Sequence, residues 1–112
     1  MSKYRAQKTD VDGIRFASKR EAEYYLQLKA LQRAGAIRDL ELQPRFTLQP
    51  SFKNRLGKTE RAIVYVADFR HWDVKKKCEV VTDVKGFQTV VYRMKRKMLL
   101  YRYPDLVFEE AQ

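Results

Sequence analysis

The chain has 112 residues, 45% of them hydrophobic and 34% charged, which fits one compact domain with its own core and excludes global disorder. Its 24 Lys and Arg outnumber its 14 Asp and Glu, so the formal net charge is +10. An excess of this size favours a polyanion as the partner, with nucleic acid ahead of an anionic membrane.

The sequence gives no sign of membrane insertion, secretion or zinc binding. No apolar run approaches the ~18 residues that span a bilayer, and the N-terminus lacks a signal-peptide pattern. Cys78 is the only cysteine and His71 the only histidine. An internal disulfide is therefore excluded, a zinc site of three or four nitrogen and sulfur ligands is not expected, and we expect a cytoplasmic protein.

The N-terminal residues 1–12 are polar and basic and show no periodicity. We expect them to form a flexible basic arm, followed by a single domain over residues 13–112. Asp12-Gly13 is typical of a turn, and Ile14 and Phe16 predict a short extended segment after it.

The first helix is expected from Ser18 to about Ala34. Ser18-Lys19-Arg20-Glu21 is a capping box, and Gly35 is a natural residue to end the helix. At about 100° per residue, Glu21 falls on the side that faces the body of the protein and Glu23 on the far side. The expected inward stripe consists of Tyr24, Leu28 and Leu31, with Tyr25 beside it.

Residues 37–49 alternate between apolar and polar side chains, which predicts a strand pair or a bent strand. Pro44 marks an edge or a bulge in it, and Gln43 is a candidate site residue for its position beside that bend. Residues 51–61 are expected to form a loop with turn residues Asn54 and Gly57.

Residues 63–86 predict two strands joined by a basic turn, because both halves are rich in Val, Ile, Tyr and Phe. The first strand carries Asp68 and the second carries Asp83 and Lys85, which are two residues apart and share a face. Charged groups inside good strands are costly unless they are paired or bind metal, so they indicate a working site.

A second helix is predicted from about Thr89 to Arg102, ended by Pro104, and a last strand at residues 106–108. Its expected core stripe is Val91, Met94, Met98 and Tyr101. Tyr92 is a candidate for stacking on a base. The candidate DNA-binding residues are the basic residues of this helix and of the preceding turn: Arg93, Lys95, Arg96 and Lys97, with Lys75, Lys76 and Lys77.

The carboxylates of Glu21, Asp68 and Asp83 stand on adjacent predicted elements. Three converging carboxylates repel one another unless a divalent cation lies between them, and Mg²⁺ or Mn²⁺ takes such oxygen ligands. This ion can polarise a phosphodiester and activate a water, while Lys85 orients the water or neutralises developing charge. The residues therefore predict metal-dependent phosphodiester hydrolysis.

These motifs resemble the PD-(D/E)XK nuclease superfamily: Asp68 ends one strand, Asp83-Val84-Lys85 ends the next, and an acidic helix precedes both. The resemblance implies an αβββαβ, restriction-endonuclease-like α/β (α+β) core with a mixed sheet. It also implies metal binding by Asp68, Asp83 and the Val84 carbonyl, with Lys85 catalytic and Glu21 completing the site. Ala67 replaces the proline of the motif, and a second matching triplet, Asp73-Val74-Lys75, lies in the polar turn.

The phrases SKREAEYY, LELQPRF, YVADF and DVKGFQT are more closely similar to small phage and prophage proteins placed in that superfamily. This similarity implies an endonuclease of the Holliday-junction-resolving type in a bacterial host cell, acting on branched DNA. We expect a homodimer with no cofactor besides the ion. The alternative is a catalytically silent or partner-dependent DNA-binding module on the same fold.

Overall fold

A computed structural model of the chain describes residues 7–84 and 88–111. Its elements in chain order are β1 (Thr9–Val11), β2 (Ile14–Phe16), α1 (Lys19–Arg33), β3 (Ile37–Leu42), β4 (Arg45–Gln49), β5 (Phe52–Lys53), β6 (Thr59–Glu60), β7 (Ile63–Val66), β8 (Phe69–Asp73), β9 (Cys78–Val84), α2 (Val90–Arg102) and β10 (Val107–Ala111).

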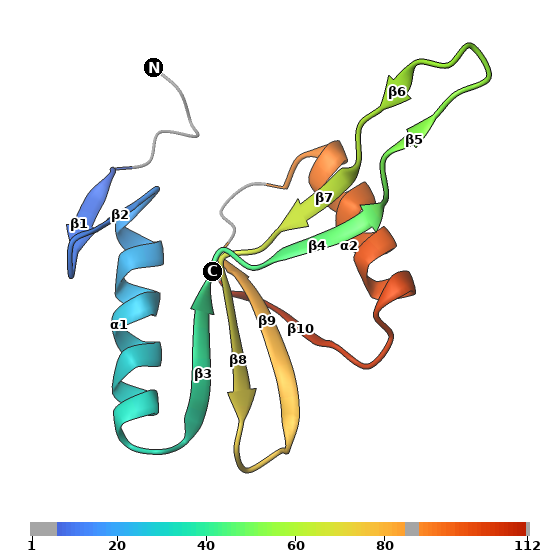
Figure 1. Cartoon of the computed structure of the whole chain (residues 1–112). Coiled ribbons are helices and arrows are strands. Elements are labelled where there is room, and N and C mark those ends of the chain that lie inside the picture. The colour runs from blue at the N-terminus through green and yellow to red at the C-terminus, as the bar shows by residue number, and fades with distance from the viewer. Residues whose placement is uncertain (1–6, 85–87, 112) are drawn as a thin grey trace.

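The central sheet contains β10, β9, β8 and β3, side by side in that order (Figure 1). β3, β8 and β9 pair antiparallel, whereas β9 and β10 pair parallel, so the sheet is mixed. α2 makes the crossover that joins the two parallel strands, as such a pair requires. The predicted α+β class with αβββαβ order is confirmed.

Two of these strands continue beyond the sheet as a bent ribbon (Figure 1). β4 follows β3 after a bend at Gln43–Pro44, β7 precedes β8 before a bend at Ala67–Asp68, and β4 pairs with β7. The Gln43 N–H donates to the Asp68 carbonyl at 3.0 Å, which keeps the two chains paired through the bend. The predicted bend at Pro44 is confirmed, but the strand that begins at Ile63 is interrupted where it was expected to be continuous.

The two helices cover opposite faces of the central sheet. Phe69 of β8 packs on the α1 side with Tyr25 and Leu28, while Val81 of β9 packs on the α2 side with Leu99. Phe69 pairs with Thr82, so Val81 and Asp83 point to the face opposite Phe69. The carboxylate of Asp83 therefore belongs to the α2 side.

The capping signals of α1 are confirmed, and its inward face is confirmed except at one end. The Glu21 N–H donates to the Ser18 hydroxyl at 3.0 Å, and Gly35 follows the C-cap with φ +83°. Glu21, Tyr25 and Leu28 are buried and Glu23 is exposed, as expected. Leu31 is 44% exposed, so the stripe ends one turn earlier than predicted.

The predicted core stripe of α2 is confirmed only at Met98, which packs against the core on the α2 side, although the helix bounds are correct. Val91, Met94 and Tyr101 are exposed, and Leu99 is the fully buried residue of this helix. The sequence offers two apolar stripes on α2, and the sheet buries the one centred on Leu99, where α2 packs on β4 and β7. The choice between them was made by tertiary packing.

The N-terminal segment is more ordered than the sequence indicates. Thr9–Val11 is a strand that pairs with Ile14–Phe16, so the irregular arm expected through residue 12 does not extend that far. Arg15 pairs with Asp10 across this hairpin at 2.6 Å. Residues 1–6 lie outside the described part of the chain.

Candidate functional site

Asp68 and Asp83 lie opposite each other where β8 and β9 meet the bend. The N–H of Asp68 donates to Oδ1 of Asp83 at 2.9 Å and to the carbonyl of Thr82 at 3.2 Å. The N–H of Val84 donates to Oδ2 of Asp68 at 2.7 Å. Each carboxylate thus accepts a backbone hydrogen bond from the other strand, which fixes both acids at the end of the hairpin.

The carboxylate of Asp83 is buried and hydrogen-bonded to an aromatic side chain of the α2 side. Its relative exposure is 1%, and the hydroxyl of Tyr65 donates to its Oδ2. Burial first, and then this hydrogen bond, raises the pKa of Tyr65 far above its ordinary value. The raised pKa keeps Tyr65 protonated near neutral pH, so its hydroxyl can donate to Asp83.

The carboxylate of Asp68 faces a different environment. Together with Glu21 of α1 and Gln43 of the bend it lines a hollow of about 210 Å³, closed from the side by β2 residues 14–16. Glu21 is 8% exposed, and the Ser18 cap fixes the first turn of the helix that carries it. The structure thus brings Glu21 and Asp68 to one place and leaves Asp83 outside the lining.

Gln43 occupies a backbone conformation that is unusual for its type. Its φ is +52°, in the left-handed region that costs a non-glycine residue about 1 kcal/mol or more. The neighbouring Pro44 and the hydrogen bond to the Asp68 carbonyl hold it there. Strain of this kind persists only where surrounding structure enforces it, and here it holds Gln43 among the residues that line the hollow.

The donors on this hollow suit a hard cation. Mg²⁺ prefers oxygen ligands and often binds through one or two carboxylates while keeping several waters. Glu21 and Asp68 supply two carboxylates there. Within residues 7–84 and 88–111, no three Asp, Glu, His or Cys side chains form a group that could hold a metal ion. Two carboxylates are the number that Mg²⁺ often takes from a protein when water completes its ligand shell.

Two further residues of the predicted site lie at the end of β9. Val84 is the last residue of that strand and is tied to Asp68 through its N–H. Lys85, the predicted catalytic lysine, lies outside the described residues.

The predicted DNA-binding residues of α2 fall into two groups. Arg93 and Lys97 are exposed. Lys95 donates to the Val64 carbonyl at 3.1 Å, and the guanidinium of Arg96 lies 5.6 Å from the ring centroid of Phe108. The first two therefore present their charge to solvent, while the other two are partly engaged by the body of the protein.

Tyr92, the candidate for base stacking, packs beside Tyr65 with ring centroids 6.2 Å apart. Its hydroxyl donates to Glu110 at 2.6 Å. Burial, then this hydrogen bond, raises the pKa of Tyr92 above its ordinary value. Tyr92 thus packs against the tyrosine that donates to Asp83.

The basic turn Lys75–Lys77 lies at the opposite end of the sheet. All three lysines are exposed, and the turn joins Asp73 to Cys78. Asp83 lies five positions after Cys78 on the strand, which is roughly 17 Å at strand spacing. The turn can reach a nucleic acid only well away from the carboxylates.

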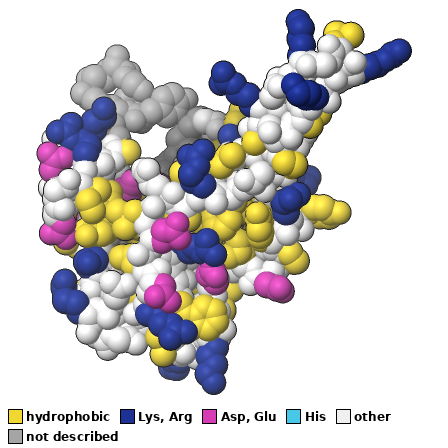
Figure 2. All heavy atoms as spheres, viewed as in Figure 1, with side chains coloured by type: hydrophobic (Ala, Val, Ile, Leu, Met, Phe, Trp, Pro, Cys, Tyr) yellow, Lys and Arg dark blue, Asp and Glu magenta, His cyan; other side chains and the backbone are white. Residues whose placement is uncertain are grey.

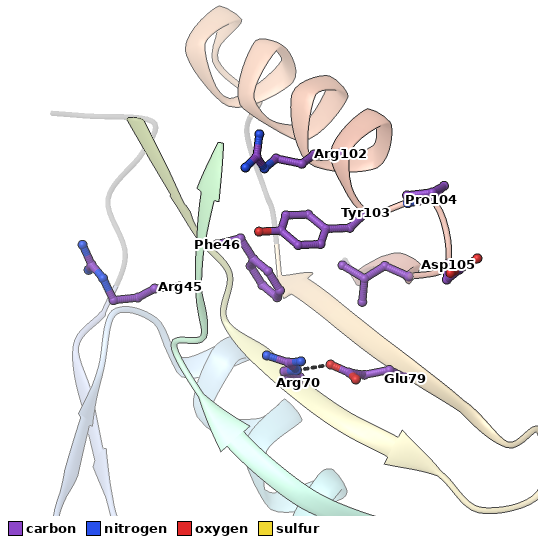
Figure 3. A pocket seen from close by; sticks show the side chains of 9 residues that line it. Arg45, Phe46, Arg70, Glu79, Arg102, Tyr103, Pro104 and Asp105 are labelled. Atoms are coloured by element: carbon purple, nitrogen blue, oxygen red, sulfur yellow. Dashed lines mark hydrogen bonds and ion pairs between the residues drawn. The ribbon is translucent and has the colours of Figure 1, made fainter. Parts of the chain in front are cut away.

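A second hollow, rich in arginine, lies on the α2 side and was not predicted from the sequence. It encloses about 480 Å³, and Figure 3 shows Arg70 paired with Glu79 at one end and Arg102 at the other. Arg45 stands at its rim, and Arg70 also lies 5.3 Å from the ring centroid of Phe46. Single arginines on separate elements carry no sequence signal, because the fold alone gathers them.

Comparison with known proteins places the chain in one family. Residues 1–110 match the family described as "Protein of unknown function (DUF1064)", and the chain belongs to it. No curated protein and no solved structure matches the chain. Within the described residues, no helix is long and apolar enough to cross a membrane.

Proposed function

We propose that this member of the family is a divalent-metal-dependent endonuclease that hydrolyses phosphodiester bonds in DNA, preferring branched DNA of the Holliday-junction type. The observation that carries the proposal is the hollow shared by Glu21 and Asp68, beside the hydrogen-bonded Asp68–Asp83 pair. The αβββαβ order and the net charge of +10 support it.

Glu21 and Asp68 would hold Mg²⁺ or Mn²⁺ in this hollow. When bound, such an ion lowers the pKa of a coordinated water and polarises a phosphoryl oxygen. Asp83 positions Asp68 by accepting its backbone N–H, and the Val84 N–H orients the Asp68 carboxylate. By resemblance, the Val84 carbonyl and Asp83 would join the ligand set, and Lys85 would orient the attacking water.

DNA would lie across the exposed basic side chains of the protein. Arg93 and Lys97 on α2, with Lys75–Lys77 at the far turn, supply charge that phosphates attract. Because a chain of this size offers little surface to a four-way junction, we propose a homodimer whose two sites cut symmetric strands. We further propose that the enzyme works in the cytoplasm of a bacterial host, encoded by a phage or prophage.

Cleavage of a labelled four-way junction and a matched linear duplex, with Mg²⁺, Mn²⁺ or EDTA, tests the proposal. We expect metal-dependent nicking of the junction, reduced more than 100-fold by Glu21→Gln, because a lost ligand removes several kcal/mol of transition-state stabilisation. Glu23→Gln, on the exposed side of the same helix turn, is the matched control and should cleave normally.

Equal rates in the two glutamate variants would contradict the assignment of Glu21. Cleavage of both substrates at one rate would keep the nuclease and remove the preference for branches.

A second candidate function is a DNA-binding module without catalysis. The burial of Asp83 favours it, because a carboxylate at 1% exposure with Tyr65 on its Oδ2 resembles a structural acid. Salt-sensitive DNA binding without cutting in either metal would select this alternative.

A further inference from the structure

The ribbon that continues β4 and β7 ends in an arm, residues 50–62, that projects from the body of the molecule (Figure 1). The radius of gyration is 16.2 Å, compared with about 13 Å for a compact domain of this length. β5 and β6 pair within the arm and keep it extended. β4 and β7 are paired antiparallel, so a short turn could connect them. The arm is much longer than that connection requires.

The arm is strongly basic. It carries four exposed basic residues against one acid, Glu60, whose carboxylate accepts the Asn54 side-chain amide at 3.0 Å. Figure 2 shows Lys and Arg side chains around its outer end, with hydrophobic atoms among them. The four basic residues are Lys53, Arg55, Lys58 and Arg61.

The tip of the arm is a tightly bonded turn. Asn54 Oδ1 accepts the N–H groups of Leu56 and Lys58 at 2.9 and 3.1 Å, and the Gly57 N–H donates to the Asn54 carbonyl at 2.9 Å. The Asn54 N–H in turn donates to the Lys58 carbonyl at 2.8 Å. Gly57 has φ +80°, as a three-residue hairpin turn with a bulge requires.

Leu56 stands at this tip with 81% of its surface exposed. Burying a leucine stabilises a structure by about 1.5–3 kcal/mol, and this one is held in water by a rigid turn between two cations. An apolar side chain at the end of a basic ribbon matches the wedges that DNA-bending proteins insert between base steps.

We infer that the arm is a DNA-binding element whose basic flanks contact phosphates and whose Leu56 inserts at an unstacked base step. Such steps are cheapest to open at a branch or nick, where stacking is already interrupted. The inference rests on the proposed function for the identity of the ligand, and it adds a physical basis for preferring branched over continuous DNA.

Binding of the full chain to a fluorescent four-way junction and a matched duplex, in EDTA so that hydrolysis is absent, tests the arm. We expect Leu56→Ser to weaken junction binding about tenfold, while duplex binding changes less than about twofold. With 2-aminopurine at the branch, the wild-type chain should raise the fluorescence of the unstacked base and Leu56→Ser should not.

Two further variants separate charge from shape. Arg55→Gln with Lys58→Gln should weaken both substrates and lower the salt slope by about 2, because two phosphate contacts are lost. Gly57→Ala keeps every charge and Leu56, and its methyl group would meet no atom within 4 Å. Because the turn needs φ +80° at residue 57, alanine there should distort the tip. We therefore expect Gly57→Ala to bind the duplex normally but to lose its preference for the junction.

Leu26→Ser on α1, where the leucine is 47% exposed, is the control for Leu56→Ser, and Lys29→Gln with Arg33→Gln is the control for lost charge. Unchanged junction binding in Leu56→Ser and in the charge variant would overturn the inference. The tip would then be a candidate for contacting a protein instead of DNA. Binding is measured without metal, so the outcome of this test does not depend on whether the hollow at Glu21 supports cleavage.

Discussion

The carboxylates of Asp68 and Asp83 lie on opposite sides of the central sheet and differ in their surroundings. On the α1 side, Asp68 shares an accessible hollow with Glu21. On the α2 side, Asp83 is buried and accepts a hydrogen bond from Tyr65. Two aspartates joined by a hydrogen bond thus lie in different surroundings, one lining a hollow and the other buried.

This difference indicates that Asp68 and Asp83 have separate roles, one in activity and one in stability. An ion can reach a carboxylate that lines a hollow, whereas a buried carboxylate is stabilising only while its hydrogen bonds persist. We therefore expect stability to depend mainly on the α2 side and activity mainly on the α1 side. The following variants test that division, from the largest expected effect to the smallest.

The α2 side should lose most when its central leucine is shortened. Leu99 is 0% exposed, so Leu99→Ala should lower the free energy of unfolding by roughly 3 kcal/mol, as transfer and cavity costs add. Met94→Ala, on the exposed stripe of the same helix, should change it by less than about 0.5 kcal/mol. Urea denaturation measures both, and equal losses would restore the stripe expected from the sequence.

The two aspartates should differ in what they support. Asp83→Ala removes a buried acceptor of the Tyr65 hydroxyl and leaves a cavity, so the free energy of unfolding should fall by about 2 kcal/mol. Asp68→Ala removes the acceptor of one backbone N–H and should cost about 1 kcal/mol, while cleavage of the junction falls more than 100-fold. A larger stability loss for Asp68→Ala would break the comparison.

Tyr65→Phe tests the enclosure of Asp83 directly. It removes the donor to a buried carboxylate and keeps the ring, so we expect a loss of roughly 1.5 kcal/mol in thermal or urea denaturation. Tyr101→Phe is the matched control, because Tyr101 is 89% exposed and should change stability negligibly. Equal midpoints for the two variants would show that the hydroxyl contributes nothing.

His71 should give the smallest effect, seen as a pH dependence. Burial lowers its pKa below the ordinary 6.5, against the opposing charges of Glu109 and Asp73. The unfolded chain then binds a proton that the folded chain resists, so stability falls as pH drops below about 6.5, by at most about 1.4 kcal/mol per pH unit. His71→Gln cannot titrate, so the difference between the urea midpoints of variant and wild type should be constant above that pH and change only below it.

Local chemistry determined most of the secondary structure in advance. The Ser18 and Thr89 caps, Gly35 and the bend at Pro44 lie where their side chains or dihedral limits demand. Such signals act within four residues, so they survive any tertiary arrangement. The arm was expected as a loop because two-residue strands such as β5 carry too few residues for a pattern.

The candidate site was predictable as a set of residues but not as an arrangement. Alternation along β9 placed Asp83 on one face, yet nothing in the sequence told which helix would cover that face. The interruption at Ala67–Asp68 likewise depends on pairing with Gln43 and Pro44, more than twenty residues earlier in the chain.

The sequence by itself determined the two helices, the main strands of the central sheet, their order and the acids that could carry chemistry, because capping, turns and strand alternation are local properties. Tertiary structure decided which stripe of α2 is buried, which aspartate is enclosed and how far the arm projects. These outcomes depend on which apolar surfaces become buried in the shared core. The free energy of burial depends on the area buried and not on the separation of residues along the chain, so local sequence patterns do not determine it.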